Sequence, residues 1–280
     1  MRILIATSGR ESAEPALEQG AYVAKKLKVK PTLLLVEERG QTDAAAALEA
    51  ALARLAEFGV EAQPKLRRGR PADEIVAEVK EGEFDLLVIG EGRHPNLIER
   101  VFGHTAQKVL ARMPCSVLMA NAVRESFGRV LVCDSLASEG GLVRGFLEGF
   151  LGLLSEKRDV TILHVMSQMG AGPSVEGWEL RANADELIQR KTIEGELITE
   201  DLERAEKSGK LKPIAKVRHG LVVDEIIEEM SEGAYDLLVL GAHRGEGWER
   251  FLLEDLAGEI VANSEVPVLV LPRKLADLSG

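Results

Sequence analysis

An internal repeat constrains the fold of this chain more than any other feature of its sequence. Residues 64–121 align without a gap with residues 215–272 at a constant offset of 151. Within the repeat, residues 84–90 (FDLLVIG) return as residues 235–241 (YDLLVLG). Each of these segments is a short apolar run between an aspartate and a glycine, which is typical of a parallel strand covered by helices on both faces. The chain is therefore predicted to be a tandem duplication of one domain, and we refer to the two halves as copy one and copy two.

Length, apolar runs and cysteine content narrow the class of protein. A chain of 280 residues suits two domains of ordinary size. Its apolar runs are too short to span a membrane, so no membrane partner is expected. Cys115 and Cys133 form neither a disulfide framework nor a metal-binding motif, which favours the reducing cytoplasm.

The charge is divided unevenly between the two copies. Residues 1–125 contain 18 acidic and 18 basic side chains, so the remainder carries the whole net charge of −11. An acidic second half argues against binding to the phosphates of nucleic acid. We interpret the acidic surface as a solvated one that favours solubility.

Strands and helices alternate along copy one. The apolar patterns predict strands at 2–7, 31–36, 62–67, 84–89 and 115–119, and helices at 13–27, 43–58, 71–81 and 104–112. This alternation predicts an α/β fold in which parallel strands are joined by right-handed crossovers. The expected architecture is two tandem five-stranded parallel sheets, each with helices on both faces.

Copy two repeats this pattern with one addition. A polar linker at 121–126 separates a domain at 1–122 from a domain at 127–275, whose first two strands are expected at 129–133 and 160–165. An inserted loop and helix is expected at about 168–210, with a long charged helical segment over 184–207. That segment is either a lid or partner-docking element or, as we favour, a solvated helix packed on its own sheet.

Five motifs together resemble a known family. They are RILIATSGRESAEPAL at the start of the chain, TLLLVEE, RRGRPADEI, DLLVIG and PCSVLM, and they are similar to those of the universal stress protein family. The resemblance covers nearly all of both copies and implies the Rossmann-like fold of the adenine nucleotide alpha hydrolases. Many members of that family bind ATP between the first and fourth strands. This is where the strand order reverses, and open α/β sheets generally bind ligands there.

The resemblance implies a set of candidate nucleotide-binding residues in copy one. ATP-binding members carry an Asp at the end of the first strand and, after the fourth strand, Gly, two residues, Gly, nine residues, Gly and then Ser or Thr. Such glycines let backbone N–H groups approach phosphates at the start of the next helix. Here Ser8 stands at the acidic position, Arg93 at the second glycine and His104 at the hydroxyl position. The candidate residues are Ser8, Gly9, Val36, Arg68, Gly90, Arg93, Gly103, His104 and Thr105.

Copy two departs further from this pattern. Gly241 stands at the first glycine of the motif, but Arg244 stands at the second glycine. Glu254 and Asp255 stand at the final Gly and Ser. A carboxylate about 4 Å from a phosphate charge costs about 4 kcal/mol at an effective dielectric constant of about 20. Copy two is therefore not expected to bind ATP. Asp134 lies within one residue of the acidic position of the first strand, and the sequence leaves this alignment open.

Two functions remain open after these observations. The favoured one is a cytoplasmic, non-enzymatic stress-response or regulatory protein with degenerate nucleotide sites and no firm cofactor. The alternative is an adenine-nucleotide sensor that binds ATP or AMP in copy one. No enzyme is expected, because the sequence has no GxSxG motif, no metal-ligand spacing among its five histidines, and no identifiable general base or Mg²⁺ carboxylate.

The fifth strand of each copy is expected to pair with the other. In the family, two domains associate through this strand, and an unpaired apolar edge favours unwanted association. Residues 116–119 and 267–271 should therefore meet within one chain and form an intrachain pseudo-dimer. The sequence leaves open whether the chain also forms a homodimer and whether it binds an unidentified protein partner.

Overall fold

The computed structural model describes residues 1–40, 42–90, 103–112, 115–134, 141–156, 158–166, 178, 181–208, 211–242 and 249–272, with only the backbone described at 242 and 249–255. Contacts divide the chain into two compact units. Unit 1 contains Met1–Glu125 together with Gly245–Pro272, and unit 2 contains Ser126–Arg244. Unit 1 therefore includes the last helix and the last strand of copy two.

The sheet of unit 1 has the strand order β3-β2-β1-β4-β5-β10. Its strands are β1 (Ile3–Thr7), β2 (Thr32–Glu37), β3 (Gln63–Arg68), β4 (Leu86–Gly90), β5 (Ser116–Ala120) and β10 (Val268–Pro272). The first five are parallel to one another, and β10 pairs antiparallel with β5, with Leu269 opposite Leu118. The predicted pairing of the two fifth strands is thus confirmed.

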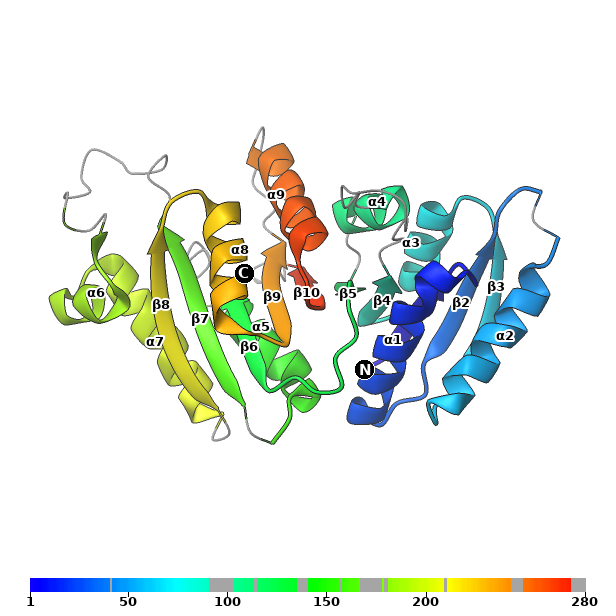
Figure 1. Ribbon diagram of the computed structural model, residues 1–280, viewed down its shortest axis with the longest axis horizontal. Coiled ribbons are helices and arrows are strands. Elements are labelled where there is room, and N and C mark those ends of the chain that lie inside the picture. The colour runs from blue at the N-terminus through cyan, green and yellow to red at the C-terminus, as the bar shows by residue number, and fades with distance from the viewer. Residues whose placement is uncertain are drawn as a thin grey trace, which may run out of the picture. The chain divides into compact units, whose positions relative to one another are not determined.

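Helices cover both faces of this sheet (Figure 1). They are α1 (Glu14–Leu27), α2 (Ala44–Glu57), α3 (Pro71–Glu81), α4 (His104–Arg112) and α9 (Glu249–Asn263), and a short 3-10 turn, η1 (Glu11–Ala13), precedes α1. Helices α1 and α2 pack together against β1 and β2, while α3 packs with α4 on the other side. All five residues of β1 are buried because helices lie on both sides of it, which explains its continuous apolar sequence.

Unit 2 has the strand order β9-β6-β7-β8, all parallel. Its strands are β6 (Arg129–Cys133), β7 (Asp159–Met166), β8 (Lys212–His219) and β9 (Leu237–Ala242). Its helices are α5 (Gly141–Phe150), α6 (Ala184–Arg190), α7 (Ile193–Lys207) and α8 (Val222–Gly233), with a 3-10 turn η2 (Leu151–Leu153) after α5. The predicted α/β class with tandem, mostly parallel strands is confirmed.

The prediction of one long helix over 184–207 is wrong, because the segment forms two helices, α6 and α7. Lys191 ends α6 with a left-handed φ of 53°, and the Thr192 hydroxyl caps α7 by accepting the Gly195 N–H at 3.0 Å. A Cβ at Gly195 would lie 2.2 Å from the Leu187 carbonyl oxygen. The glycine therefore permits the close packing of the two helices.

Helix α7 takes the place in copy two that α2 has in copy one. Both connect the second strand of their copy to the third, and three of the four buried positions of each helix correspond when residues 150 positions apart are matched. Leu48, Ala51 and Leu55 on α2 correspond in this way to Ile198, Asp201 and Ala205 on α7, and all six residues are buried. The additional helix of copy two is therefore α6.

The aspartate that opens each repeated segment fixes the start of the neighbouring strand. Asp85 Oδ2 accepts the Arg2 N–H at 2.7 Å. Asp236 Oδ2 accepts the N–H groups of Gly128 and Arg129, each at 2.9 Å. The two carboxylates thus bind backbone donors at the amino ends of β1 and β6, which explains why both copies carry an aspartate there.

Among the helices of the described residues, none has both the length and the apolar composition needed to cross a membrane.

Candidate functional site

The candidate residues of copy one follow strands of unit 1 whose carboxyl ends lie at one edge of the sheet. The order β3-β2-β1-β4 places the reversal of strand order between β1 and β4, where open α/β sheets bind ligands. The loops after β1, β2, β3 and β4 therefore border the expected ligand site.

The loop after β1 is a tight turn held by side-chain hydroxyls. Thr7 Oγ1 accepts the Gly9 N–H at 3.1 Å, and Ser8 Oγ accepts the Arg10 N–H at 3.4 Å. Gly9 has a φ of 68°, and a Cβ at this position would lie 2.7 Å from the Cβ of Ala47 on α2. Only glycine therefore allows the loop to approach α2 this closely.

A cavity of about 380 Å³ opens beside this loop. Its walls come from the loops after β1 and β2 and from the start of α2, and the lining residues are Ser8, Gly9, Arg10, Glu38, Arg39, Gly40, Asp43 and Ala47. The lining combines two arginines with two acidic side chains. Such a site can pair with an anionic group and also accept hydrogen bonds from a polar ligand.

Val36 and Arg68 lie at the same edge of the sheet but do not line the cavity. Val36 is buried within β2, opposite Arg67 in the register of β2 and β3. Arg68 ends β3, and its Nε donates to Glu37 Oε2 at 2.8 Å while the arginine side chain remains 79% exposed. Arg68 is therefore within an ion pair and is still accessible to solvent.

The remaining candidates lie after β4. Gly90 is the last residue of that strand, and a Cβ there would lie 3.3 Å from the Cβ of Ala16 on α1. The Gly103 carbonyl accepts the Gln107 N–H at 3.0 Å, so Gly103 immediately precedes the first turn of α4. His104 in that turn is exposed and Thr105 is half-buried. The prediction for Arg93 lies outside the described residues.

Of the candidate residues, the structure brings Ser8 and Gly9 together in the cavity lining. Sequence reasoning missed the other six lining residues, which are Arg10, Glu38, Arg39, Gly40, Asp43 and Ala47. A signal for them was present, because they follow the first or the second strand and parallel strands present their carboxyl ends at one edge. The family motif did not include them.

The strand register resolves the open alignment at the end of the first strand of copy two. Ile3 pairs with Leu86 and Val130 pairs with Leu237, and Leu86 and Leu237 are equivalent in the repeat. Asp134 therefore corresponds to Thr7, one residue before the position of Ser8. Asp134 is 4% exposed, so its carboxyl group lies inside unit 2.

The helix that follows the fourth strand also differs between the copies. In copy two this helix, α9, begins at Glu249, so that Glu254 and Asp255 lie within the helix and not at its start. In copy one the equivalent positions are Gly103 and His104, where α4 begins. Copy two thus has no helix start at the place where the family motif would put the phosphates.

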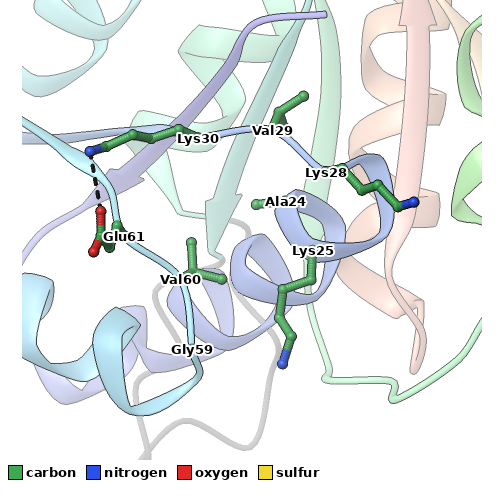
Figure 2. A pocket seen from close by; sticks show the side chains of 8 residues that line it. All are labelled: Ala24, Lys25, Lys28, Val29, Lys30, Gly59, Val60 and Glu61. Atoms are coloured by element: carbon green, nitrogen blue, oxygen red, sulfur yellow. Dashed lines mark hydrogen bonds and ion pairs between the residues drawn. The ribbon is translucent and has the colours of Figure 1, made fainter.

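A second cavity, of about 310 Å³, lies at the opposite end of α1 (Figure 2). Its lining includes Lys25, Lys28 and Lys30, around a floor of Ala24, Val29 and Val60. Lys25 Nζ donates to the Phe58 carbonyl at 3.0 Å, and Lys30 Nζ lies 3.5 Å from Glu61 Oε2. The ammonium groups point away from the floor in Figure 2, so these lysines mainly balance the carbonyl ends of α1 and α2.

The two cysteine thiols are poor nucleophiles in this structure. Burial raises the pKa of Cys115 to about 12, against a smaller opposing effect of a backbone hydrogen bond at Leu87. Burial also raises the pKa of Cys133, and the charges of Glu229 and Asp134 raise it further. Because the thiolate is the reactive form, both cysteines are interpreted as packed side chains.

Comparison with known proteins identifies relatives of the whole chain. The model of the universal stress protein family matches residues 1–121 and 127–272. No match was found among curated proteins. A solved structure of a universal stress protein from Archaeoglobus fulgidus aligns with a TM-score of 0.68 at 17% identity, covering 97% of this chain and 96% of that one. A protein of unknown function from Pseudomonas aeruginosa aligns with a TM-score of 0.67 at 18% identity, covering 97% and 92%. At these identities the structures show a shared fold.

Proposed function

Because this chain belongs to the universal stress protein family, we propose that it is a regulatory stress protein with one working ligand site, which binds an adenine nucleotide in copy one. Copy two does not bind a nucleotide under this proposal, and neither copy catalyses a reaction. The proposed location is the cytoplasm, because Cys115 and Cys133 are free thiols.

The observation that carries this proposal is the cavity of about 380 Å³ at the carboxyl ends of β1 and β2. Its volume is within the range of small-molecule sites, and it lies beside the point where the strand order reverses. Arg10 and Arg39 are the cationic side chains of its lining and would pair with phosphate oxygens. Glu38 and Asp43 can accept hydrogen bonds from hydroxyl or amino groups.

The features of copy two support a loss of binding there. Asp134 and Asp201 place two carboxyl groups in the interior where copy one has Thr7 and Ala51. A phosphate brought close to them would meet like charge in a partly dry environment. The start of α9, five residues before Glu254, also removes the free backbone donors from the motif position.

The first experiment identifies any small molecule that is bound to the purified protein. The freshly purified protein is denatured and released small molecules are identified by mass spectrometry, and the protein is then titrated with ATP and with AMP in a calorimeter. We expect one nucleotide per chain. Replacement of Arg39 by Ala should weaken binding about tenfold or more, because a charge-assisted hydrogen bond contributes about 1.5–3 kcal/mol.

Lys30→Ala is the matched control, since it removes a cation from the cavity at the other end of α1. The control should bind as the unmodified protein does. Weaker binding in Lys30→Ala with unchanged binding in Arg39→Ala would place the ligand in the cavity lined by Lys30 and would contradict the proposed site. Absence of both released nucleotide and heat of binding would refute the ligand site and leave a regulatory protein that acts through contacts with other proteins.

A further inference from the structure

Three neighbouring loops at the carboxyl edge of the copy-one sheet carry arginines. Arg10 follows β1, Arg39 follows β2, and Arg68 and Arg70 lie at the end of β3 and just after it. All four residues are exposed. Adjacent strands of a sheet are about 4.8 Å apart, so these loops form a row along the edge. Arg10 and Arg39 line the cavity, whereas Arg68 and Arg70 lie beyond it on the side of β3.

Backbone hydrogen bonds hold the loop after β3 beside the end of β2. The two strands lie side by side (Figure 1), and Glu37 stands opposite Arg68 in their register. The Gly69 N–H donates to the Glu37 carbonyl oxygen at 3.1 Å. The Arg70 carbonyl accepts the Asp73 N–H at 3.0 Å, where α3 begins. The positions of the two arginines beside β2 are therefore fixed by the backbone.

The guanidinium groups of these two arginines keep donors for a further anion. Arg68 donates through Nε to Glu37 Oε2 at 2.8 Å, and its side chain is 79% exposed. Its terminal nitrogens have no hydrogen-bond partner among the described residues. Asp73, in the first turn of the helix that Arg70 precedes, is paired with Arg112. Exposed guanidinium groups with free N–H donors are well suited to bind phosphate oxygens.

Copy two has the same backbone contact at this place without the arginines. The Gly220 N–H donates to the Met166 carbonyl oxygen at 3.3 Å, which repeats the bond of Gly69 in copy one. The repeat places His219 and Leu221 where copy one has its two arginines. Leu221 carries no charge and is 56% exposed. The fold of this loop therefore does not require an arginine at either position.

We propose that the ligand of copy one carries at least two phosphate groups and that Arg68 and Arg70 bind the second. This inference rests on the nucleotide site proposed above, in which Arg10 and Arg39 bind the first phosphate. The second phosphate extends past the end of β2 to the guanidinium groups beside β3. Its source is a longer phosphate chain or a phosphate on the ribose, because both present the same oxygens. AMP, with its single phosphate, is then a weak ligand.

The size of the effect follows from the exposure of the two arginines. Water and salt screen exposed charges, and Glu37 already binds one side of Arg68. A phosphate that pairs with both arginines should therefore gain about tenfold in affinity, which is less than a buried pair would give.

Calorimetric titration of the full chain with three ligands tests the proposal. The ligands are AMP, ATP and the adenosine bisphosphate that carries its second phosphate on the ribose. We expect ATP or the bisphosphate to bind about tenfold more tightly than AMP, and the tighter of the two identifies the source of the second phosphate. In Arg68→Met/Arg70→Met this preference should disappear. A preference that persists in the double variant would overturn the proposal.

Lys28→Met/Lys30→Met is the matched control. It also removes two exposed cations that lie two positions apart, but from the cavity at the other end of α1. Lys30 is paired with Glu61 at 3.5 Å, much as Arg68 is paired with a glutamate. The control should keep the preference for a second phosphate. Its loss in the control would show that net charge sets the preference, and it would overturn the assignment to Arg68.

A third variant separates the arginines from the carboxylate that their replacement releases. Glu37→Gln/Arg68→Met/Arg70→Met lacks both the arginines and the charge of Glu37. It should show no preference among the three ligands, as the double variant does. A restored preference would overturn the proposal, because repulsion by the released Glu37 would then explain the double variant.

The same titrations distinguish failure of this inference from failure of the proposed function. Equal affinity of the unmodified protein for all three ligands would overturn the second phosphate site and leave the nucleotide site in copy one supported. Absence of binding by all three would refute the nucleotide site itself, and this inference with it.

Discussion

Arg67 and Arg218 hold equivalent carboxylates in the two units of this protein. Arg67 Nη1 lies 2.8 Å from Oε2 of Glu78, and Arg218 Nη1 lies 3.1 Å from Oε2 of Glu229. Both glutamates are nearly buried, with 6% and 2% of their side chains exposed. The arginines belong to the third strands, β3 and β8, and the glutamates to the helices that follow. Each ion pair therefore fastens the outermost strand of a copy to the next helix.

Replacement of Arg218 by Met should destabilise unit 2 by about 2 kcal/mol, because it leaves the buried Glu229 with weaker compensation. Glu229 keeps Lys216 at 2.6 Å and the Tyr235 hydroxyl at 2.6 Å, so the loss should stay below that of a fully unpaired buried charge. Hydrogen exchange of the β8 and α8 amides as a function of urea measures the change within unit 2.

Lys207→Met is the control for that experiment. Lys207 also pairs with a glutamate, Glu203, but both side chains are more than half exposed. The loss of this pair should change stability by no more than about 0.5 kcal/mol. Similar losses in the two variants would show that burial of Glu229 does not set the strength of the arginine pair.

Acid should destabilise the protein through two glutamates that pair with these arginines, Glu81 with Arg67 and Glu229 with Arg218. The hydrogen bond and charge of Arg67 lower the pKa of Glu81. Burial acts to raise the pKa of Glu229, but hydrogen bonds from Lys216, Tyr235 and Arg218 outweigh it and lower the pKa. Carboxylates with a lowered folded-state pKa stabilise the fold at pH values above their ordinary pKa, near 4.5, and this contribution is lost as pH falls from that value through the lower folded-state pKa. We expect the urea midpoint to fall between pH 5 and pH 3, and to fall less in Arg67→Met. An identical acid dependence in that variant would contradict this explanation.

Substitutions of two glycines in the lining of the copy-one cavity distinguish the cost of steric crowding from the cost of backbone strain. Gly9 and Gly40 both have positive φ, at 68° and 90°. A Cβ on Gly9 would lie 2.7 Å from Ala47, whereas a Cβ on Gly40 would have no atom within 4 Å. Gly40→Ala should therefore cost about 1 kcal/mol from backbone strain alone, and Gly9→Ala about 1–3 kcal/mol more from overpacking. Urea unfolding measures both variants, and equal losses would show that α2 moves aside without cost.

Most of the secondary structure follows from local sequence. The apolar strand segments, Pro71 at the start of α3 and the alternation of strands with helices predicted every strand of the described residues to within about two residues. The prediction of a continuous helix over 184–207 failed because Thr192 and Gly195 are weak local signals. Gly195 is required by the approach of Leu187 from a neighbouring helix, and a contact of this kind is not visible in the sequence.

The sequence by itself determined the duplication, the α/β class, the family and the edge of the sheet at which a ligand would bind, because these depend on periodic patterns and on the rule that parallel strands end at one edge. Tertiary structure decided which residues meet. It placed Arg39 and Asp43 beside Gly9, and it put β10 into unit 1 beside β5. The lining of that cavity cannot be read from two separate loops, because their approach depends on how the strands and α2 pack, and only the packed fold supplies it.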